Sequence, residues 1–206
     1  MISAILLGAG ESRRMGFDKL SLPWGKETVF ERCLETLLRS RVQEVVIVRG
    51  PRNSAMRNRF HGKTIKMVTN PHPRAGMSCS IRTGLRAIHL GSDGILIALG
   101  DQPFLKARTI NALIRAFDRE KERIIIPAFQ GKTGHPVIFH KAYKKELMNL
   151  KGDVGGRSII ERHRENVRVV KVKSNGVLKD VDTWQDYERG RKKGGARRKG
   201  VEKGSR

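Results

Sequence analysis

Short aliphatic and β-branched runs alternate along the chain with longer segments that carry an apolar stripe at helical spacing. In residues 29–39, Phe30, Leu34 and Leu37 recur on one face, as in an amphipathic helix packed on a sheet. Further helices are predicted over 78–90, 106–120 and 158–164. Strands are predicted at Ile2–Leu7, Glu44–Val48, Ile65–Thr69, Ile95–Leu99, Ile124–Pro127, Val137–Phe139 and Val167–Val172. This order predicts an α/β fold, a three-layer α/β/α sandwich with a mostly parallel sheet and ligands at the carboxyl ends of its strands.

The last part of the chain follows a different pattern. The turn signal Ser174-Asn175-Gly176 and residues 177–180 after the last strand predict a hairpin at the sheet edge. Beyond residue 189 the chain is rich in Gly, Lys and Arg and has no apolar periodicity. We therefore expect one domain over 1–190 and a disordered basic tail over 191–206. The run 191–199 has no aromatic residue, so only nonspecific nucleic-acid contacts are expected of it.

Composition limits the class of protein. The 206 residues include 43 Lys and Arg against 20 Asp and Glu, a net charge of +23, which favours anionic partners such as nucleotides; a solvated basic surface is the alternative. No apolar run approaches the ~20 residues of a membrane span. Two cysteines exclude a disulfide scaffold, and no C-x-x-C pair exists for zinc. The first residues are typical of a strand and not of a signal peptide, so a cytoplasmic protein is expected.

A glycine-rich segment with basic side chains, Leu7–Lys19, follows the first strand directly. Its glycines allow backbone N–H groups to approach a phosphate closely, and its basic side chains add positive charge. The glycines are Gly8, Gly10 and Gly16, and the basic residues are Arg13, Arg14 and Lys19. The dinucleotide fingerprint requires glycine at the position of Arg13, and the P-loop requires G-K-[ST], so neither matches. A phosphate loop of another kind is predicted, with a simple glycine turn as the alternative.

Carboxylates stand at two other sites. Asp101 in Leu99-Gly-Asp-Gln-Pro103 follows an apolar strand that Pro103 ends. A carboxylate there suits Mg²⁺, which takes one or two protein carboxylates and substrate phosphates; a helix cap is the alternative. In residues 180–186, Thr183 and Asp186 have the spacing of a capping box. Caps and dipole partners are therefore the local alternative for all three acids of that segment, Asp180, Asp182 and Asp186.

Three further motifs give weaker signals. Residues 76–80, G-M-S-C-S, open a helix for which Ser78 is the predicted N-cap. Residues 134–136, G-H-P, precede a strand, and residues 152–157, G-D-V-G-G-R, open another helix as a possible anion site. His135 and His140 differ by five positions, so on one strand they face opposite sides and form no metal pair.

Together the six motifs resemble the molybdenum cofactor cytidylyltransferases, which belong to the nucleotidyltransferase family that includes the molybdopterin guanylyltransferases. The pattern is L-A-A-G-x-S-x-R-M-G-x-x-K, G-M-S-x-S-x-x-x-G, G-D-Q-P, G-H-P, G-D-x-G-A-R and D-x-D-T-P-x-D, and it runs in order from Leu7 to Asp186. Three positions depart from it: Gly8 and Gly156 replace Ala, and Trp184 replaces Pro. Gly8 is expected to loosen the nucleotide loop, and Trp184 removes the fixed φ of Pro at the helix start.

The resemblance implies a nucleotide-diphospho-sugar-transferase-like fold and a set of site residues. Nucleotide binding falls to Leu7, Gly8, Ala9, Gly10, Ser12, Arg14, Lys19, Ser78 and Asp101. Of these, Arg14, Lys19 and Asp101 are the implied catalytic residues. Asp101 and Asp182 would hold Mg²⁺, and the acceptor would contact His135, Asp153 and Gly155.

The implied reaction moves CMP from CTP to the phosphate of molybdenum-bound molybdopterin and releases pyrophosphate, with a molybdenum hydroxylase as a possible partner. Ala9 matches the cytidylyl branch, whereas the guanylyl branch carries Gly there, so CTP is favoured over GTP. Two alternatives stay open: a transferase that uses GTP or a sugar phosphate, and a non-catalytic chaperone for the molybdenum cofactor. The presence of Lys19, Asp101 and Asp182 argues against the chaperone.

Overall fold

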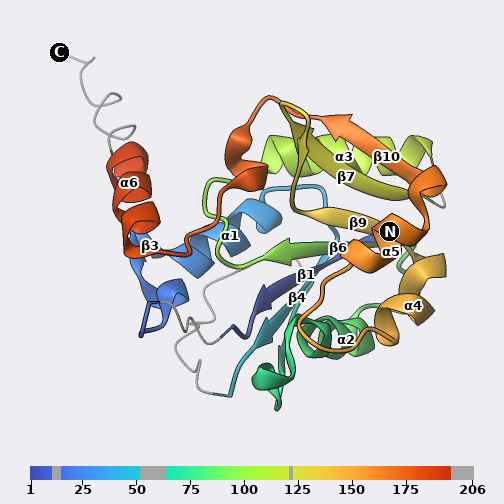
Figure 1. Cartoon of the computed structure of the whole chain (residues 1–206), viewed down its shortest axis with the longest axis horizontal. Helices are drawn as coiled ribbons and strands as arrows, with labels where there is room; N and C mark the ends of the chain where they lie inside the picture. The colour runs from blue at the N-terminus through green and yellow to red at the C-terminus, as the bar shows by residue number, and fades with distance from the viewer. Residues whose placement is uncertain (11–14, 52–63, 121–122, 196–206) are drawn as a thin grey trace.

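The computed structural model describes residues 1–10, 15–51, 64–120 and 123–195, and a central twisted sheet organises them (Figure 1). The sheet has the order β10-β7-β9-β6-β1-β4-β5, with β8 paired to β7. Its strands are β1 Ile2–Gly8, β4 Glu44–Arg49, β5 Thr64–Thr69, β6 Gly94–Leu99, β7 Ile124–Phe129, β8 Lys132–Thr133, β9 Val137–His140 and β10 Val167–Lys171. The short strands β2, Pro23–Trp24, and β3, Glu27–Thr28, form a separate antiparallel pair.

The mostly parallel sheet predicted from the sequence is confirmed, and all the strands expected in it are present. β1 lies parallel to β4 and β6, β4 to β5, and β7 to β10. β1 and β4 are buried along nearly their whole length, which is why they read as continuous apolar runs. β9 is antiparallel to β6 and β7, so the residues that precede it lie at the edge where the parallel strands end.

Helices cover both faces of the sheet and complete the predicted three layers (Figure 1). They are α1 Val29–Leu38, α2 Met77–Ala87, α3 Ala107–Arg119, α4 Lys144–Met148, α5 Arg157–Arg162 and α6 Trp184–Gly195. Alternate residues of β1 point to the two faces: Leu6 packs in one core cluster with residues of α1 and α3, and Ile5 packs in another with residues of α2, α4 and α5. Short 3-10 turns span Lys19–Ser21, Pro73–Ala75, Lys141–Tyr143, Arg164–Asn166 and Asn175–Leu178.

The hairpin predicted at residues 174–180 is wrong. β10 is the edge strand, but Asn175–Leu178 form a 3-10 turn that folds back against the sheet. A Cβ on Gly176 would lie 2.3 Å from the carbonyl oxygen of Phe104, so the chain passes very close to that backbone. The carbonyl of Val177 accepts a hydrogen bond from the backbone N–H of His135 (3.0 Å). Tertiary contacts therefore override the local turn signal.

α6 continues to Gly195, beyond residue 190 where the expected domain ends, and the domain boundary itself stays a prediction. Residues 196–206 lie outside the described residues, so the disordered tail stays a prediction for them. Among the described helices, none has the length and apolar character that crossing a bilayer requires.

Candidate active site

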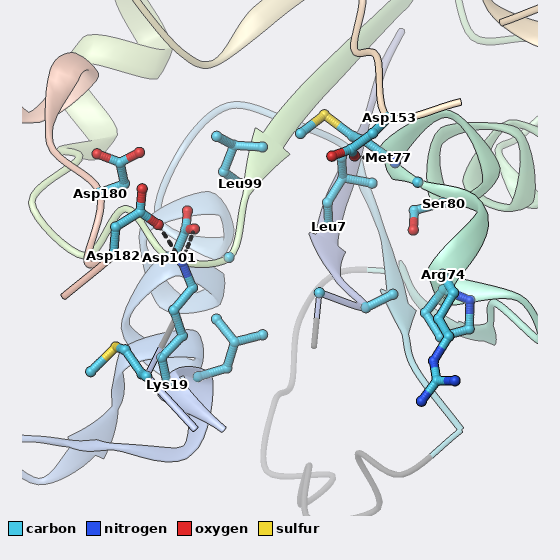
Figure 2. Close-up of a pocket in the computed structure, with 17 residues that line it drawn as sticks. Leu7, Lys19, Arg74, Met77, Ser80, Leu99, Asp101, Asp153, Asp180 and Asp182 are labelled. Atoms are coloured by element: carbon cyan, nitrogen blue, oxygen red, sulfur yellow. Dashed lines mark hydrogen bonds and ion pairs between the residues drawn. The ribbon is translucent and has the colours of Figure 1, made fainter. Parts of the chain in front are cut away.

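A pocket of about 610 Å³ opens at the carboxyl ends of β1 and β6, the edge predicted to collect ligands (Figure 2). It is lined by Leu7, Ala9, Gly10, Met15, Lys19, Leu20, Pro73, Arg74, Gly76, Met77, Ser80, Leu99, Gly100, Asp101, Asp153, Asp180 and Asp182. The backbone N–H of Gly100 donates to the carbonyl of Leu7 (2.9 Å), which joins the ends of the two strands. The glycine-rich segment Leu7–Lys19, the G-D-Q-P motif and residues 180–186 therefore all contribute to one pocket.

Lys19 lies between two carboxylates at one end of this pocket (Figure 2). Its Nζ is 2.7 Å from Asp101 Oδ2 and 2.7 Å from Asp182 Oδ1. Lys19 begins a 3-10 turn that Asp18 caps through the N–H of Leu20 (3.0 Å). Asp101 follows β6, and its carbonyl accepts from the N–H of Val181 (2.9 Å). These backbone contacts bring together residues that are far apart in the sequence.

The charges in this cluster shift the ionisation of its members. Burial alone would lower the pKa of Lys19, but the carboxylates of Asp101 and Asp182 outweigh that effect and raise it above its usual range. Burial raises the pKa of the neighbouring Asp180, and the charges of Asp182 and Asp101 add to that rise. Lys19 is therefore a fixed cation at neutral pH.

The local alternatives for the acidic residues can now be separated. α3 begins at Ala107, so Asp101 does not cap it. Thr183 Oγ1 accepts from the N–H of Asp186 (3.2 Å), and Asp186 Oδ2 accepts from the N–H of Thr183 (3.0 Å). The predicted capping box is therefore confirmed for Asp186. Asp182 instead contacts Lys19 inside the pocket, so the two acids of one motif have different environments.

The first turn of α2 forms the opposite side of the pocket. The N–H of Met77 donates to Asp153 Oδ1 (3.0 Å), so the cap comes from a distant loop. Gly76 has φ +90°, and a Cβ there would lie 2.5 Å from the backbone of Gly152, which explains the glycine. The prediction that Ser78 caps α2 is wrong: it lies within the first turn, fully buried, and its Oγ has no hydrogen-bond partner among the described residues.

The sequence-predicted site residues divide into three groups. Those that line the pocket are Leu7, Ala9, Gly10, Lys19, Asp101, Asp153 and Asp182. Those that lie outside its lining are Gly8, Ser78, His135 and Gly155. Ser12 and Arg14 fall outside the described residues. Gly8 belongs to β1 and not to a loop, and the Phe30 ring fills the place of an alanine methyl, so the loosening expected of this glycine is replaced by tight packing.

His135 is partly buried near Asp101, and it is not among the residues that line the pocket. Burial lowers the pKa of His135, although the charge of Asp101 opposes the change. Its Nδ1 has no hydrogen-bond partner in the described part of the chain. The lowered pKa favours the neutral form of the imidazole.

Sequence reasoning missed Arg74 and Ser80 as pocket residues. Arg74 lies on the side of the pocket opposite Lys19, in the turn that precedes α2 (Figure 2). A basic residue two positions before the G-M-S-x-S motif is the signal that could have identified it. Basic side chains thus stand on both sides of the pocket, an arrangement that suits a polyanion.

The donor set fits a hard divalent cation that is completed by its substrate. No cluster of three or more His, Cys, Asp or Glu side chains with metal-ligand geometry is found among the described residues. Two carboxylates already converge on one cation, the ammonium of Lys19, and Asp101 Oδ1 is buried with no partner in the described chain. Mg²⁺ is commonly held by one or two carboxylates together with substrate phosphates.

Residues 4–167 match the model of the MobA-like NTP transferase domain. The chain belongs to this family. This MobA-like transferase is 31% identical to the purine catabolism protein PucB of Bacillus subtilis, over 89% of this chain and 93% of PucB. It is 23% identical to the molybdenum cofactor cytidylyltransferase of Escherichia coli, over 90% and 93% of the two chains.

The fold of this MobA-like transferase is also found in a solved relative. It superposes on Rv0371c of Mycobacterium tuberculosis in complex with manganese with a TM-score of 0.76 and 28% identity, covering 93% of this chain and 98% of that one. The MobA-like transferase is accordingly a nucleotidyltransferase enzyme, as the six motifs predicted.

Proposed function

We propose that this MobA-like transferase moves CMP from CTP to the phosphate of molybdenum-bound molybdopterin, with Mg²⁺ as the metal. The observation that carries the proposal is the convergence of Lys19, Asp101 and Asp182 in a pocket at the carboxyl ends of β1 and β6. The name of the Escherichia coli relative supports cytidylyl transfer to the molybdenum cofactor, and the manganese in Rv0371c supports a divalent metal.

The reaction needs no protein nucleophile, because the acceptor phosphate is already an anion. An oxygen of that phosphate forms a bond to the α-phosphorus of CTP, and the bond from that phosphorus to the bridging oxygen breaks. Pyrophosphate leaves with the bridging oxygen and its electron pair. The protein therefore contributes position and charge neutralisation.

The pocket residues divide this task between two sides. The Lys19 ammonium would neutralise charge on the triphosphate, and Ala9 and Gly10 at the end of β1 would let the nucleotide approach the backbone. Arg74 and the loop of Asp153 stand across the pocket, where the acceptor would lie. Asp101 and Asp182 would hold Mg²⁺, which neutralises negative charge on the bound phosphates.

The first test is pyrophosphate release from each nucleoside triphosphate, with and without the molybdopterin acceptor. We expect kcat/KM for CTP to exceed that for GTP by about tenfold or more, or ~1.4 kcal/mol. Equal use of both nucleotides would remove the cytidylyl assignment and leave the transferase assignment standing. Binding of molybdopterin without any pyrophosphate release would favour a cofactor-holding protein.

The second test compares three acidic residues from two motifs. Asp101→Asn and Asp182→Asn should each lower kcat/KM by about 100-fold or more, ~2.7 kcal/mol, with an unchanged far-UV circular dichroism spectrum. Asp186→Asn is the matched control: it weakens the hydrogen bonds that the Asp186 carboxylate accepts from Thr183, so it should cost about 1 kcal/mol of stability or less and little activity. If Asp182→Asn behaved like Asp186→Asn, the two-carboxylate metal site would be wrong.

A further inference from the structure

A row of aromatic rings runs from the surface beside the pocket into the protein. We call it the aromatic ladder; its members in order are Phe17, Trp184, Tyr187, Trp24 and Phe104. Neighbouring ring centroids are 5.7, 5.1, 6.1 and 5.2 Å apart, all within the range of favourable ring contacts. The ladder holds five of the eleven aromatic residues of the chain, seven Phe, two Trp and two Tyr. This concentration needs a local explanation.

The ladder joins the three chain segments that carry Lys19, Asp101 and Asp182. Phe17 lies two residues before Lys19, and Trp184 lies two residues after Asp182. Phe104, at the inner end, lies three residues after Asp101. Each charged group is therefore tied by a short length of backbone to a ring of the same ladder.

The inner rings are firmly held. Trp24 and Tyr187 are 9% and 2% exposed, and the Tyr187 hydroxyl donates to the carbonyl of Pro23 (2.6 Å). A Cβ on Gly190 would lie 2.3 Å from Trp24 and 2.6 Å from Phe104, so α6 packs directly on these two rings. This part of the ladder anchors α6 to the body of the protein.

The outer contact has a different character. Phe17 and Trp184 are 45% and 52% exposed, yet their rings meet edge to face at an interplanar angle of 81°. Large apolar side chains this exposed gain little free energy from burial. Their stabilising effect therefore comes mainly from the contact between the two rings. The contact links the segment of Lys19 to the start of α6, the two parts that meet at the ion pair between Lys19 and Asp182.

We propose that Phe17 and Trp184 are positioning residues, whose edge-to-face contact holds Lys19 and Asp182 together in the pocket. The inference rests on the roles proposed above for Lys19 and Asp182. An edge-to-face pair changes an equilibrium constant by about two- to tenfold. Loss of either ring should therefore raise the fraction of molecules in which Lys19 is unpaired by a factor in that range.

The test uses the full chain without ligand. Acetic anhydride modifies lysines that are deprotonated and accessible, and mass spectrometry gives the rate at each site. Phe17→Ala and Trp184→Ala should each raise the rate at Lys19 by about two- to tenfold. Lys141, which pairs with Asp93 at 2.8 Å at the other edge of the sheet, is the internal reference and should not change.

Matched variants separate the contact from general loosening. The double variant should react no faster than the faster single variant, because each change removes the same contact between Phe17 and Trp184. Trp184→Phe should keep most of the protection, and Leu90→Ala, which removes a 92% exposed apolar side chain before β6, should have no effect. An unchanged rate at Lys19, a parallel rise at Lys141, or effects that multiply in the double variant would each overturn the proposal.

Kinetics then connect the contact to catalysis. With CTP, the same variants should raise KM or lower kcat in the rank order of their Lys19 labelling, with Trp184→Phe close to the wild type. If no nucleotide is turned over by the wild type, the proposed function fails while the labelling result still decides the role of Phe17 and Trp184.

Discussion

Replacing Gly8 with alanine should destabilise the protein by about 1 kcal/mol, because Phe30 occupies the space for the methyl group. The new Cβ would lie 2.5 Å from Phe30 Cε2 and 3.2 Å from its Cδ2 and Cζ. The ring is 2% exposed and also lies 2.7 Å from the place of a Cβ on Gly100, so it cannot move aside freely. Overpacking of this kind costs about 1–3 kcal/mol, and the lower entropy of the unfolded alanine chain offsets about 0.4–1 kcal/mol.

Urea denaturation followed by far-UV circular dichroism measures this effect. Gly10→Ala is the control for stability: among the described residues no atom lies within 4 Å of the place of its Cβ, so we expect a change within about 0.5 kcal/mol. Phe30→Leu should relieve the clash, so the double variant with Gly8→Ala should be more stable than the sum of the single effects by about 0.5 kcal/mol or more. If Gly8→Ala were as stable as wild type, or if the two changes were additive, the steric explanation would be refuted.

Two further predictions concern stability and the end of the chain. Glu44→Gln should lose about 1–3 kcal/mol at pH 7, because buried Glu44 accepts hydrogen bonds from Ser3, the His89 N–H and Lys66. Burial alone would raise the pKa of Glu44, but these hydrogen bonds lower it below 4.5 in the folded protein. The stability that ionised Glu44 contributes is therefore complete above pH 4.5 and is lost as the pH falls through the lower pKa of the folded state. In urea denaturation the gap to wild type should therefore close in acid; a constant gap would contradict this reasoning. Truncation after Gly195 should leave kcat and KM for CTP within about twofold, because every described residue that lines the pocket precedes residue 183; a tenfold loss would show that the tail acts in catalysis.

The sequence predicted the architecture well because the relevant signals are local. The stripe of Phe30, Leu34 and Leu37 and the apolar run of β1 follow directly from which faces are buried. The parallel order then places the motifs at one edge, and the pocket lies there. The rule that ligand-binding residues follow parallel strands could not place G-H-P, which precedes a strand. These residues reach the same edge because β9 runs antiparallel to β6.

The failures have a common physical cause. Ser78 looked like an N-cap, but the cap comes from Asp153, whose approach depends on the tight packing of Gly76 against Gly152. Local sequence gives the capping-box spacing to Asp186 alone, but it leaves a cap or dipole role open for Asp182 as well. Only the position of Lys19, more than 160 residues away, separates them. The meeting of Asp101 and Asp182 in one pocket is expected only from the family resemblance. No spacing rule connects two segments so far apart in the sequence.

The aromatic ladder also determines what an optical experiment on this protein measures. Both tryptophans of the chain, Trp24 and Trp184, belong to it, one buried and one half exposed. The two layers of helices on the sheet contain no other indole, so tryptophan emission reports on the docking of α6 beside the pocket. Circular dichroism reports on the whole sheet and its helices. Unfolding curves from the two signals coincide only if α6 detaches together with the rest of the protein, and a gap between them measures the local stability of this region.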